Sequence, residues 1–195
     1  MKTYSLTLIM TQPLTSFSEE MISWKDPPDA CHLFFVHRGV SLVDREWPWL
    51  PPGHRGYCAV DHEKYFGPRP GPSLVAGGLA TLGMLLRRSD AMLCLPHGPC
   101  LLKRQPVTSG VVVALDAEPG KAREGLRVAV GLAGCDVPIE IRLPVGRSWP
   151  TIEDLGRIRH DAREFVEVMT ALKICCKDQE FNPSKEAGSM GLICL

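Results

Sequence analysis

The stretch "GVVVALDAEPGKAREGLRVAVGLAGCDVPIEIRLPVGRSW", residues 110–149, determines the fold class of this chain. Its valine-rich run at 110–117 predicts a buried strand, because strands covered on both faces lack apolar–polar alternation. Residues 119–134 open with proline, close with glycine and carry apolar residues at helical spacing, which predicts an amphipathic helix. The apolar run at 137–146 predicts the next strand. Strand, helix and strand in this order are typical of a parallel α/β unit.

The same order of elements recurs in the rest of the chain, at an offset of roughly 105 residues. Further strands are predicted at 4–10, 31–40, 57–60, 91–95, 174–176 and 191–195, and further helices at 16–26, 74–88 and 151–173. A segment rich in proline and polar residues, 96–109, connects the two halves. We therefore predict an α/β fold of two similar units, residues 1–104 and 108–195. Each is expected to contain a mostly parallel central sheet flanked by helices.

Composition narrows the possible partners. The 195 residues include 22 basic and 22 acidic side chains, so the formal net charge is zero. A neutral chain gives no reason to expect nucleic acid or an anionic membrane as a partner. No apolar run approaches the roughly eighteen residues of a spanning helix, and "LTLIM" near the N-terminus is too short for the core of a signal peptide. We expect a cytoplasmic protein whose eight cysteines are reduced.

One of these cysteines has an unusual sequence neighbourhood. In "GYCAVDHEKYFGPRPG" (56–71), Cys58 ends a short strand and precedes a polar, proline-rich stretch. The imidazoles and the cation that could support it are His54, Arg55 and His62. Such groups favour the thiolate and lower a thiol pKa, although the nearby acids oppose this. Cys58 is thus either a reactive thiolate or a buried small hydrophobic residue followed by a polar loop.

The corresponding place in the second half holds two adjacent cysteines. Cys175 and Cys176 follow the predicted helix at 151–173 and precede Lys177. Neighbouring residues of a strand face opposite sides, so one of the pair is expected in the core and the other accessible. Two ordinary strand cysteines remain the alternative.

No metal or cofactor site is predicted. "CLPHGPC" (94–100) spaces Cys94, His97 and Cys100 three residues apart, but a closed structural zinc site needs four ligands. We expect this stretch to be a turn that binds no stoichiometric zinc. Phosphate loops, dinucleotide fingerprints, nucleophile elbows and zinc-protease motifs are absent from the sequence.

Two predicted strand exits combine a glycine with an arginine. They are "HRGV" (37–40) and "VGRSW" (145–149). Either could present backbone N–H groups and a cation to an anion.

Several segments resemble the DsrE/DsrF-like (TusBCD-type) sulfur-relay family, apparently as a tandem duplication. "KAREGLRVAVGLAG" (121–134) is similar to its first helix, "LFFVHRGVSLV" (33–43) to a strand and turn, and "LATLGMLLRRSDAMLCL" (79–95) to its closing helix and strand. The chain departs from the family in its "HRGV" turn, in the proline-rich stretch after Cys58 and in the C-terminus of the second unit, which we expect to be incomplete.

The resemblance implies a small α/β fold that assembles into oligomers. Active members carry a persulfide on a cysteine after the third strand, which would be Cys58 in the first unit and Cys175 or Cys176 in the second. The chain would then be a sulfur carrier, a persulfide-dependent sulfurtransferase, with sulfur-donor and sulfur-acceptor proteins as partners and no cofactor. Other members lack an active cysteine, so a non-catalytic structural subunit that holds partner proteins is the alternative.

Overall fold

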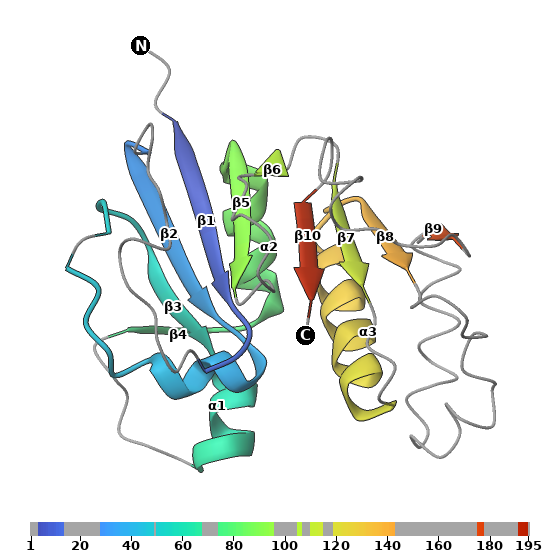
Figure 1. Ribbon diagram of the computed structural model, residues 1–195, viewed down its shortest axis with the longest axis horizontal. Helices are drawn as coiled ribbons and strands as arrows, with labels where there is room; N and C mark the ends of the chain where they lie inside the picture. The colour runs from blue at the N-terminus through green and yellow to red at the C-terminus, as the bar shows by residue number, and fades with distance from the viewer. Residues whose placement is uncertain are drawn as a thin grey trace.

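Two sheets form the centre of the computed structural model (Figure 1). The structure describes residues 4–13, 28–48, 50–67, 74–95, 105–106, 110–114, 119–142, 175–177 and 191–194. All strands of both sheets are parallel except β6, which runs antiparallel to β5. Helices lie against the sheets, which confirms the predicted α/β class with mostly parallel sheets.

The larger sheet comes from the first half of the chain. Its six strands have the order β4-β3-β2-β1-β5-β6. Their bounds are Ser5–Met10 (β1), Ala30–Phe35 (β2), Arg55–Cys58 (β3), Val75–Gly77 (β4), Ala91–Leu95 (β5) and Gln105–Pro106 (β6). The central strand β1 pairs with β2 and β5. Its nearly continuous apolar run is what a strand covered on both faces requires.

The smaller sheet comes from the second half and has the order β10-β7-β8-β9. Its strands are Val111–Ala114 (β7), Ile139–Arg142 (β8), Cys175–Lys177 (β9) and Gly191–Cys194 (β10). In this sheet β7, the first of the four strands along the chain, lies between β8, the second, and β10, the last. The order β5-β1-β2-β3 within the larger sheet follows the same rule.

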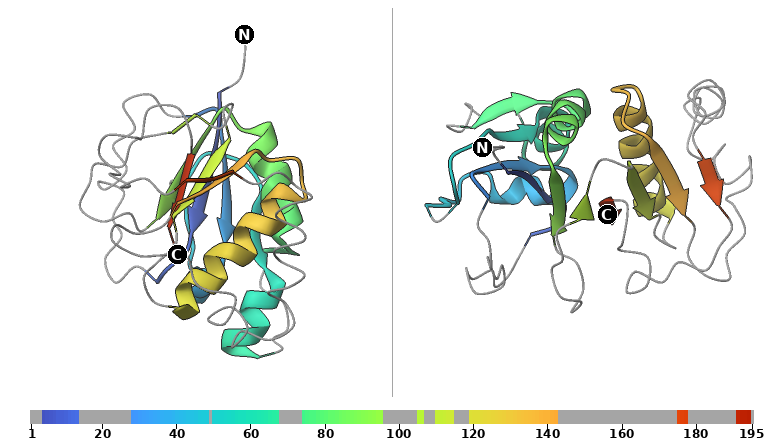
Figure 2. Two further views of the ribbon diagram at one scale, coloured as in Figure 1. Left: turned by 90° about the vertical axis from the view of Figure 1, so that its right-hand side faces the viewer. Right: turned by 90° about the horizontal axis from the view of Figure 1, so that it is seen from above.

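Four helices belong to the described residues. They are the 3-10 helix His37–Leu42 (η2) and the α-helices Ala59–Phe66 (α1), Leu79–Arg88 (α2) and Pro119–Ala133 (α3). The helices α2 and α3 lie side by side on the same face of the two sheets (Figure 2). Within the described part of the chain, every helix is too short or too polar to span a bilayer.

One hydrophobic core is shared by both halves. The first half contributes Leu82, Leu85 and Leu86 from α2 together with Ile9 and Phe34 from the strands, and the second contributes Val128, Ala129 and Leu132 from α3 together with Val111 and Ile139. A separate core lies on the opposite face of the larger sheet and contains residues such as Leu8, Leu33 and Phe35. Period-two alternation along β1 divides its side chains between these two cores.

The contact between α2 and α3 is unusually close. A Cβ atom added at Gly83 of α2 would lie 2.6 Å from Cβ of Cys135, and one added at Gly131 of α3 would lie 2.6 Å from Cβ of Leu79. Real Cβ atoms do not approach this closely. Each helix therefore offers a glycine at the point where the other helix packs.

Most of the described elements match the sequence predictions, and four segments correct them. Residues 37–40, predicted as the end of a strand, belong to the 3-10 helix η2, because the positive φ of His37 ends the extended backbone. Residues 59 and 60, predicted to continue a strand, begin α1, because Asp61 in the first turn, Lys64 in the last turn and Gly67 after it favour a helix. Residues 75–77, predicted as helix, form the edge strand β4, because two successive glycines, Gly77 at the end of β4 and Gly78 at the N-cap of α2, disfavour helix there. Residues 105 and 106 of the predicted connector form β6. The helices predicted at 16–26 and 151–173 lie outside the described residues.

Candidate functional site

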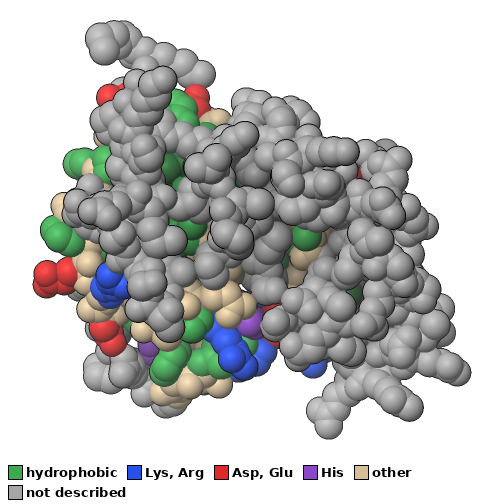
Figure 3. Space-filling model, in the orientation of Figure 1, with side chains coloured by type: hydrophobic (Ala, Val, Ile, Leu, Met, Phe, Trp, Pro, Cys, Tyr) green, Lys and Arg blue, Asp and Glu red, His purple; other side chains and the backbone are tan. Residues whose placement is uncertain are grey.

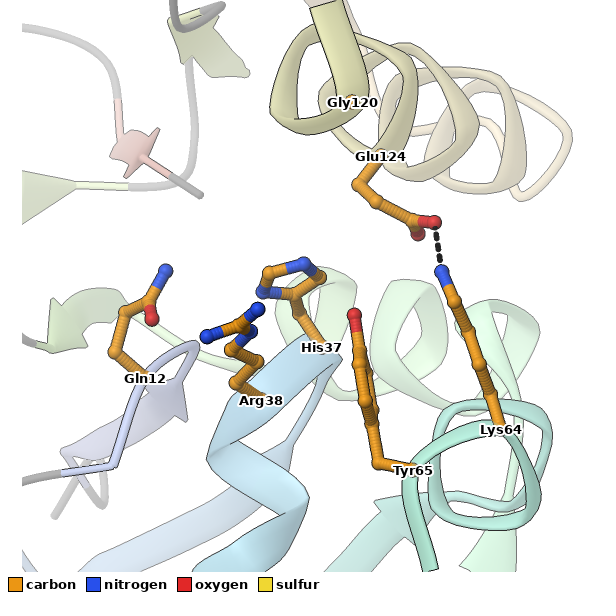
Figure 4. Close-up of a pocket in the computed structure, with 7 residues that line it drawn as sticks. All are labelled: Gln12, His37, Arg38, Lys64, Tyr65, Gly120 and Glu124. Atoms are coloured by element: carbon orange, nitrogen blue, oxygen red, sulfur yellow. Dashed lines mark hydrogen bonds and ion pairs between the residues drawn. The ribbon is translucent and has the colours of Figure 1, made fainter. Parts of the chain in front are cut away.

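A pocket of about 380 Å³ lies at the carboxyl ends of the central strands (Figure 4). Its lining residues are Gln12 after β1, His37 and Arg38 of η2, Lys64 and Tyr65 of α1, and Gly120 and Glu124 of α3. Both halves of the chain thus contribute to one pocket. Crevices outside the carboxyl ends of parallel strands are the usual ligand sites of open α/β sheets. In the space-filling view a histidine and basic side chains meet near the lower edge of the molecule (Figure 3).

The turn after β2 brings His37 and Arg38 to the pocket. Gly39 packs against the end of β1, where any side chain would collide with the backbone of Met10, and its N–H donates to the Thr11 carbonyl over 3.1 Å. His37 has a positive φ of 51°. That region is uncommon for residues other than glycine, and the surrounding contacts hold His37 in it.

Four charged side chains connect α1 with α3. Arg127 Nη2 lies 2.6 Å from Asp61 Oδ1, Arg127 Nε lies 2.8 Å from Glu124 Oε2, and Lys64 Nζ lies 2.5 Å from Glu124 Oε1. The second oxygen of Asp61 accepts the backbone N–H of His37 over 2.7 Å. We call Asp61, Lys64, Glu124 and Arg127 the α1–α3 ion network.

Two members of the ion network, Glu124 and Arg127, are held in their charged forms. Burial by itself raises the pKa of Glu124, but the hydrogen bonds from Lys64 and Arg127 outweigh burial and lower it. Burial likewise lowers the pKa of Arg127, but the Asp61 and Glu124 carboxylates outweigh this effect and raise it. The Glu124 carboxylate and the Arg127 guanidinium therefore stay ionised over a wide pH range.

Burial favours the neutral form of His37. Only 5% of the residue is exposed, and burial lowers its pKa, although the Glu124 carboxylate, a hydrogen bond with the Thr11 backbone and the Asp61 carboxylate partly oppose the effect. Among the described residues, its buried Nδ1 atom has no hydrogen-bond partner. Buried polar atoms are normally satisfied, so this nitrogen marks a place where the site is incomplete by itself.

Cys58 ends β3 and is the N-cap residue of α1. It is 1% exposed and belongs to the shared core. Burial raises the pKa of its thiol, and although the backbone at Asp61 and the Arg127 guanidinium oppose the shift, the Asp61 carboxylate adds to it. The expectation of a lowered thiol pKa is therefore wrong, because desolvation outweighs the nearby cation.

The predicted supporting residues do not act on the Cys58 thiol. Arg55 turns to the other end of the sheet, where its guanidinium donates to the carbonyl oxygens of Cys31 and Pro51. His54 donates its backbone N–H to Nδ1 of His32 over 3.1 Å. His62 is buried on α1, with its ring centroid 5.2 Å from that of Tyr57.

The two predicted site cysteines of the second half, Cys175 and Cys176, lie in the outer strand β9. Cys175 pairs with Glu140 of β8, and Cys176 and Lys177 pair with the next two residues of β8. The structure does not describe the side chains of β9, so their proposed roles stay predictions.

For the zinc prediction, Cys94 lies buried in β5, whereas His97 and Cys100 fall outside the described residues. Among the described residues, no three metal-ligating side chains come together.

Sequence reasoning missed most of the pocket. It did single out "HRGV" as a segment that could present N–H groups and a cation to an anion. This segment supplies His37 and Arg38 to the pocket. The pair Glu124 and Arg127 has the i, i+3 spacing of an ion pair on one helix face. Its partners Lys64 and Asp61 lie 60 and 66 residues away along the chain, where no local pattern shows them.

Comparison with protein-family models, with curated proteins and with solved structures finds no match. The site therefore has to be interpreted from its own geometry.

Proposed function

We propose that this chain is a DsrE-like α/β protein of two similar units that serves as a non-catalytic subunit and binds partner proteins. The observation that carries this proposal is the environment of Cys58. A sulfur-relay cysteine must meet the thiol of a partner, but Cys58 is 1% exposed and packs in the core shared by both halves. Its thiol pKa is raised by burial, which leaves little of the nucleophilic thiolate at neutral pH.

The order of the strands supports the duplication. Each sheet contains four parallel strands in the same chain-relative order, β5-β1-β2-β3 and β10-β7-β8-β9. In that correspondence β9, with Cys175 and Cys176, takes the place of β3, with Cys58. A two-unit chain in the cytoplasm would then present to its partners the arrangement that single-unit relatives form by association.

A sulfur carrier remains the second candidate, and the position of Cys58 favours it. The residue ends the third strand, and the Arg127 guanidinium acts on the thiol in the direction of the thiolate. In that reaction a cysteine thiolate would attack the outer sulfur of a donor persulfide. The donor S–S bond would break, the donor would leave as a thiolate, and the new persulfide would reside on this chain.

Thiol mapping tests the two candidates. The native protein is incubated with polysulfide, bound sulfane sulfur is released with cyanide, and alkylated cysteines are mapped over time by mass spectrometry. We expect no stoichiometric sulfane sulfur on Cys58 and slower alkylation of Cys58 than of Cys135, whose burial is only intermediate.

Matched variants assign any sulfur that does bind. Sulfur lost in Cys58→Ser would replace the subunit proposal by a carrier acting in the first unit. Sulfur kept in Cys58→Ser but lost in Cys175→Ser or Cys176→Ser would place the carrier function in the second unit.

A further inference from the structure

The pocket holds a buried polar atom that no described residue satisfies. His37 is 5% exposed, and its Nδ1 atom has no hydrogen-bond partner in the described part of the chain. Its imidazole lies among the lining side chains of Gln12, Arg38 and Tyr65 (Figure 4). The ring is fixed there, because Tyr65 packs against it edge-on at a centroid distance of 5.6 Å. A rigid, buried and unsatisfied nitrogen facing a pocket indicates a missing ligand.

The charges around this nitrogen favour an anion. Asp61 and Glu124 are already neutralised by Arg127 and Lys64 in the ion network. Arg38 is exposed and forms no ion pair with another described residue. The Lys64 side chain is 49% exposed and so keeps donors directed to solvent. The described side chains of the pocket and ion network therefore carry a net positive charge.

The N-terminus of a helix adds positive electrostatic potential to the pocket from the opposite side. Gly120 lies in the first turn of the 15-residue helix α3 and lines the pocket. The N–H groups of a first helical turn have no partner within the helix, and the helix dipole favours negative charge there. The acids Asp116 and Glu118 precede this helix in the sequence but lie outside the described residues.

We infer that this pocket binds the phosphate group of a small molecule, with Arg38 and Lys64 as its cations and His37 as a buried hydrogen-bond donor. The donors come from three elements, η2, α1 and α3, which surround the pocket rather than line one side of it. That distribution suits a tetrahedral oxyanion better than a planar carboxylate, which accepts in one plane. The volume of about 380 Å³ leaves room for an organic part beside the phosphate.

His37 suits this role because of its protonation state. Burial lowers its pKa, so the free protein keeps the imidazole neutral, and one of its nitrogens carries the only ring hydrogen. A phosphate anion favours protonation of the ring, so that in the complex Nδ1 donates to a phosphate oxygen while the ring keeps its hydrogen bond with the Thr11 backbone. The ligand thus satisfies His37, and His37 orients the ligand.

The proposal is tested by titrating the protein with inorganic phosphate and following the imidazole nitrogens of His37 by NMR. We expect saturable binding with a shift of Nδ1. Arg38→Gln should weaken binding about tenfold or more, because a charge-assisted contact is lost. Arg45→Gln is the matched control, since Arg45 is also exposed but stacks over Trp47 outside the pocket. It should bind as the wild type does.

Variants at position 37 separate a binding role from a structural one. His37→Gly keeps the positive φ and removes the imidazole, so it should weaken binding. His37→Asn should restore part of it, because asparagine tolerates this backbone and its amide offers a donor in a similar place. Unchanged melting temperatures would show that these variants fold.

Three results would overturn the proposal. They are no saturable phosphate binding, an equal loss of affinity in Arg38→Gln and Arg45→Gln, and binding of acetate as tight as that of phosphate. The last result would assign the pocket to carboxylates instead.

Discussion

Four parallel strands in each half of this chain have the same relative order, but the two halves contribute different side chains to the pocket and the core. The first half supplies the strand ends and the turn that carries His37 and Arg38, whereas the second half supplies Glu124 and Arg127 from one face of α3. Neither half has a complete pocket, and one of the two cores is shared, since its cluster of apolar residues spans both halves. The helices α2 and α3 pack against each other between the halves, so we expect the two halves to depend on each other for folding.

Separating the halves tests this interdependence most severely. We expect residues 1–104 and residues 108–195, expressed alone, to lack the cooperative unfolding of the full chain, because each would expose its side of the shared core. Urea unfolding followed by circular dichroism and NMR would measure this. A sharp, native-like transition of either fragment would show that the halves are autonomous domains.

Asp61 tests the ion network between the halves. Asp61→Ala removes the acceptor of both Arg127 and the His37 backbone N–H, so it should lower the free energy of unfolding by about 3 kcal/mol. Asp61→Asn, which keeps an acceptor, should lose less. Glu63 on the same helix is exposed, so Glu63→Ala should keep the free energy of unfolding within about 0.5 kcal/mol of the wild type. An equally small effect of Asp61→Ala would mean that the network does not hold the halves together.

Gly131 tests the close contact of the two helices. Replacing an exposed glycine in a helix by alanine normally raises the free energy of unfolding by about 1 kcal/mol. At Gly131 the new Cβ would collide with Leu79, so Gly131→Ala should instead lose about 2 kcal/mol. Gly134→Ala is the control, since its Cβ would meet its neighbours only at ordinary distances of 3.5 Å and beyond. Chemical denaturation would compare the two, and a stabilised Gly131→Ala would mean that the helices can move apart.

Of the four changes, acidification should have the smallest effect on the free energy of unfolding. Burial lowers the folded-state pKa of His37 below its ordinary value of 6.5, so the unfolded chain binds more protons in that window. The free energy of unfolding should therefore fall as the pH drops from 6.5 toward the folded-state pKa. His32, whose pKa is lowered by burial and by His54, Arg55 and Arg88, acts in the same direction within the first half.

The variant His37→Asn separates the contribution of His37 from that of His32. It should reduce the pH dependence of the free energy of unfolding. Urea titrations between about pH 7.5 and about pH 5.5 would measure this. An unchanged pH dependence in His37→Asn would assign the effect to other groups such as His32.

Apolar runs and helical spacing in the sequence predicted the strands and helices whose formation depends on nearby residues. The apolar runs of β1, β5 and β7 and the amphipathic spacing of α3 decide these structures without help from distant residues. The helix after Cys58 was missed because its polar residues suggested a loop, although Asp61, Lys64 and Gly67 are ordinary signals of helix start and end.

The site was predicted less well because neighbours in sequence need not be neighbours in space. Arg55 and Cys58 are at opposite ends of the same short strand. The arginine that was expected to activate the thiol therefore lies at the other end of the sheet, where it donates to the Cys31 carbonyl. The cation that does act on Cys58 is Arg127, from the other half of the chain. Desolvation, the dominant cause of the raised pKa, depends on packing that a single sequence does not display.

The outer strand β4 has a consequence for the behaviour of the protein in concentrated solution. It forms the edge of the larger sheet, has only three residues, and exposes 55% of Val75. Long, flat and apolar edges recruit strands from other molecules and start aggregation, and very short edge strands are one of the ways in which proteins avoid it. Three residues offer too few backbone donors and acceptors to align an incoming chain. The brevity of β4 therefore lets the sheet keep an apolar side chain at an open edge with little hazard of fibre growth.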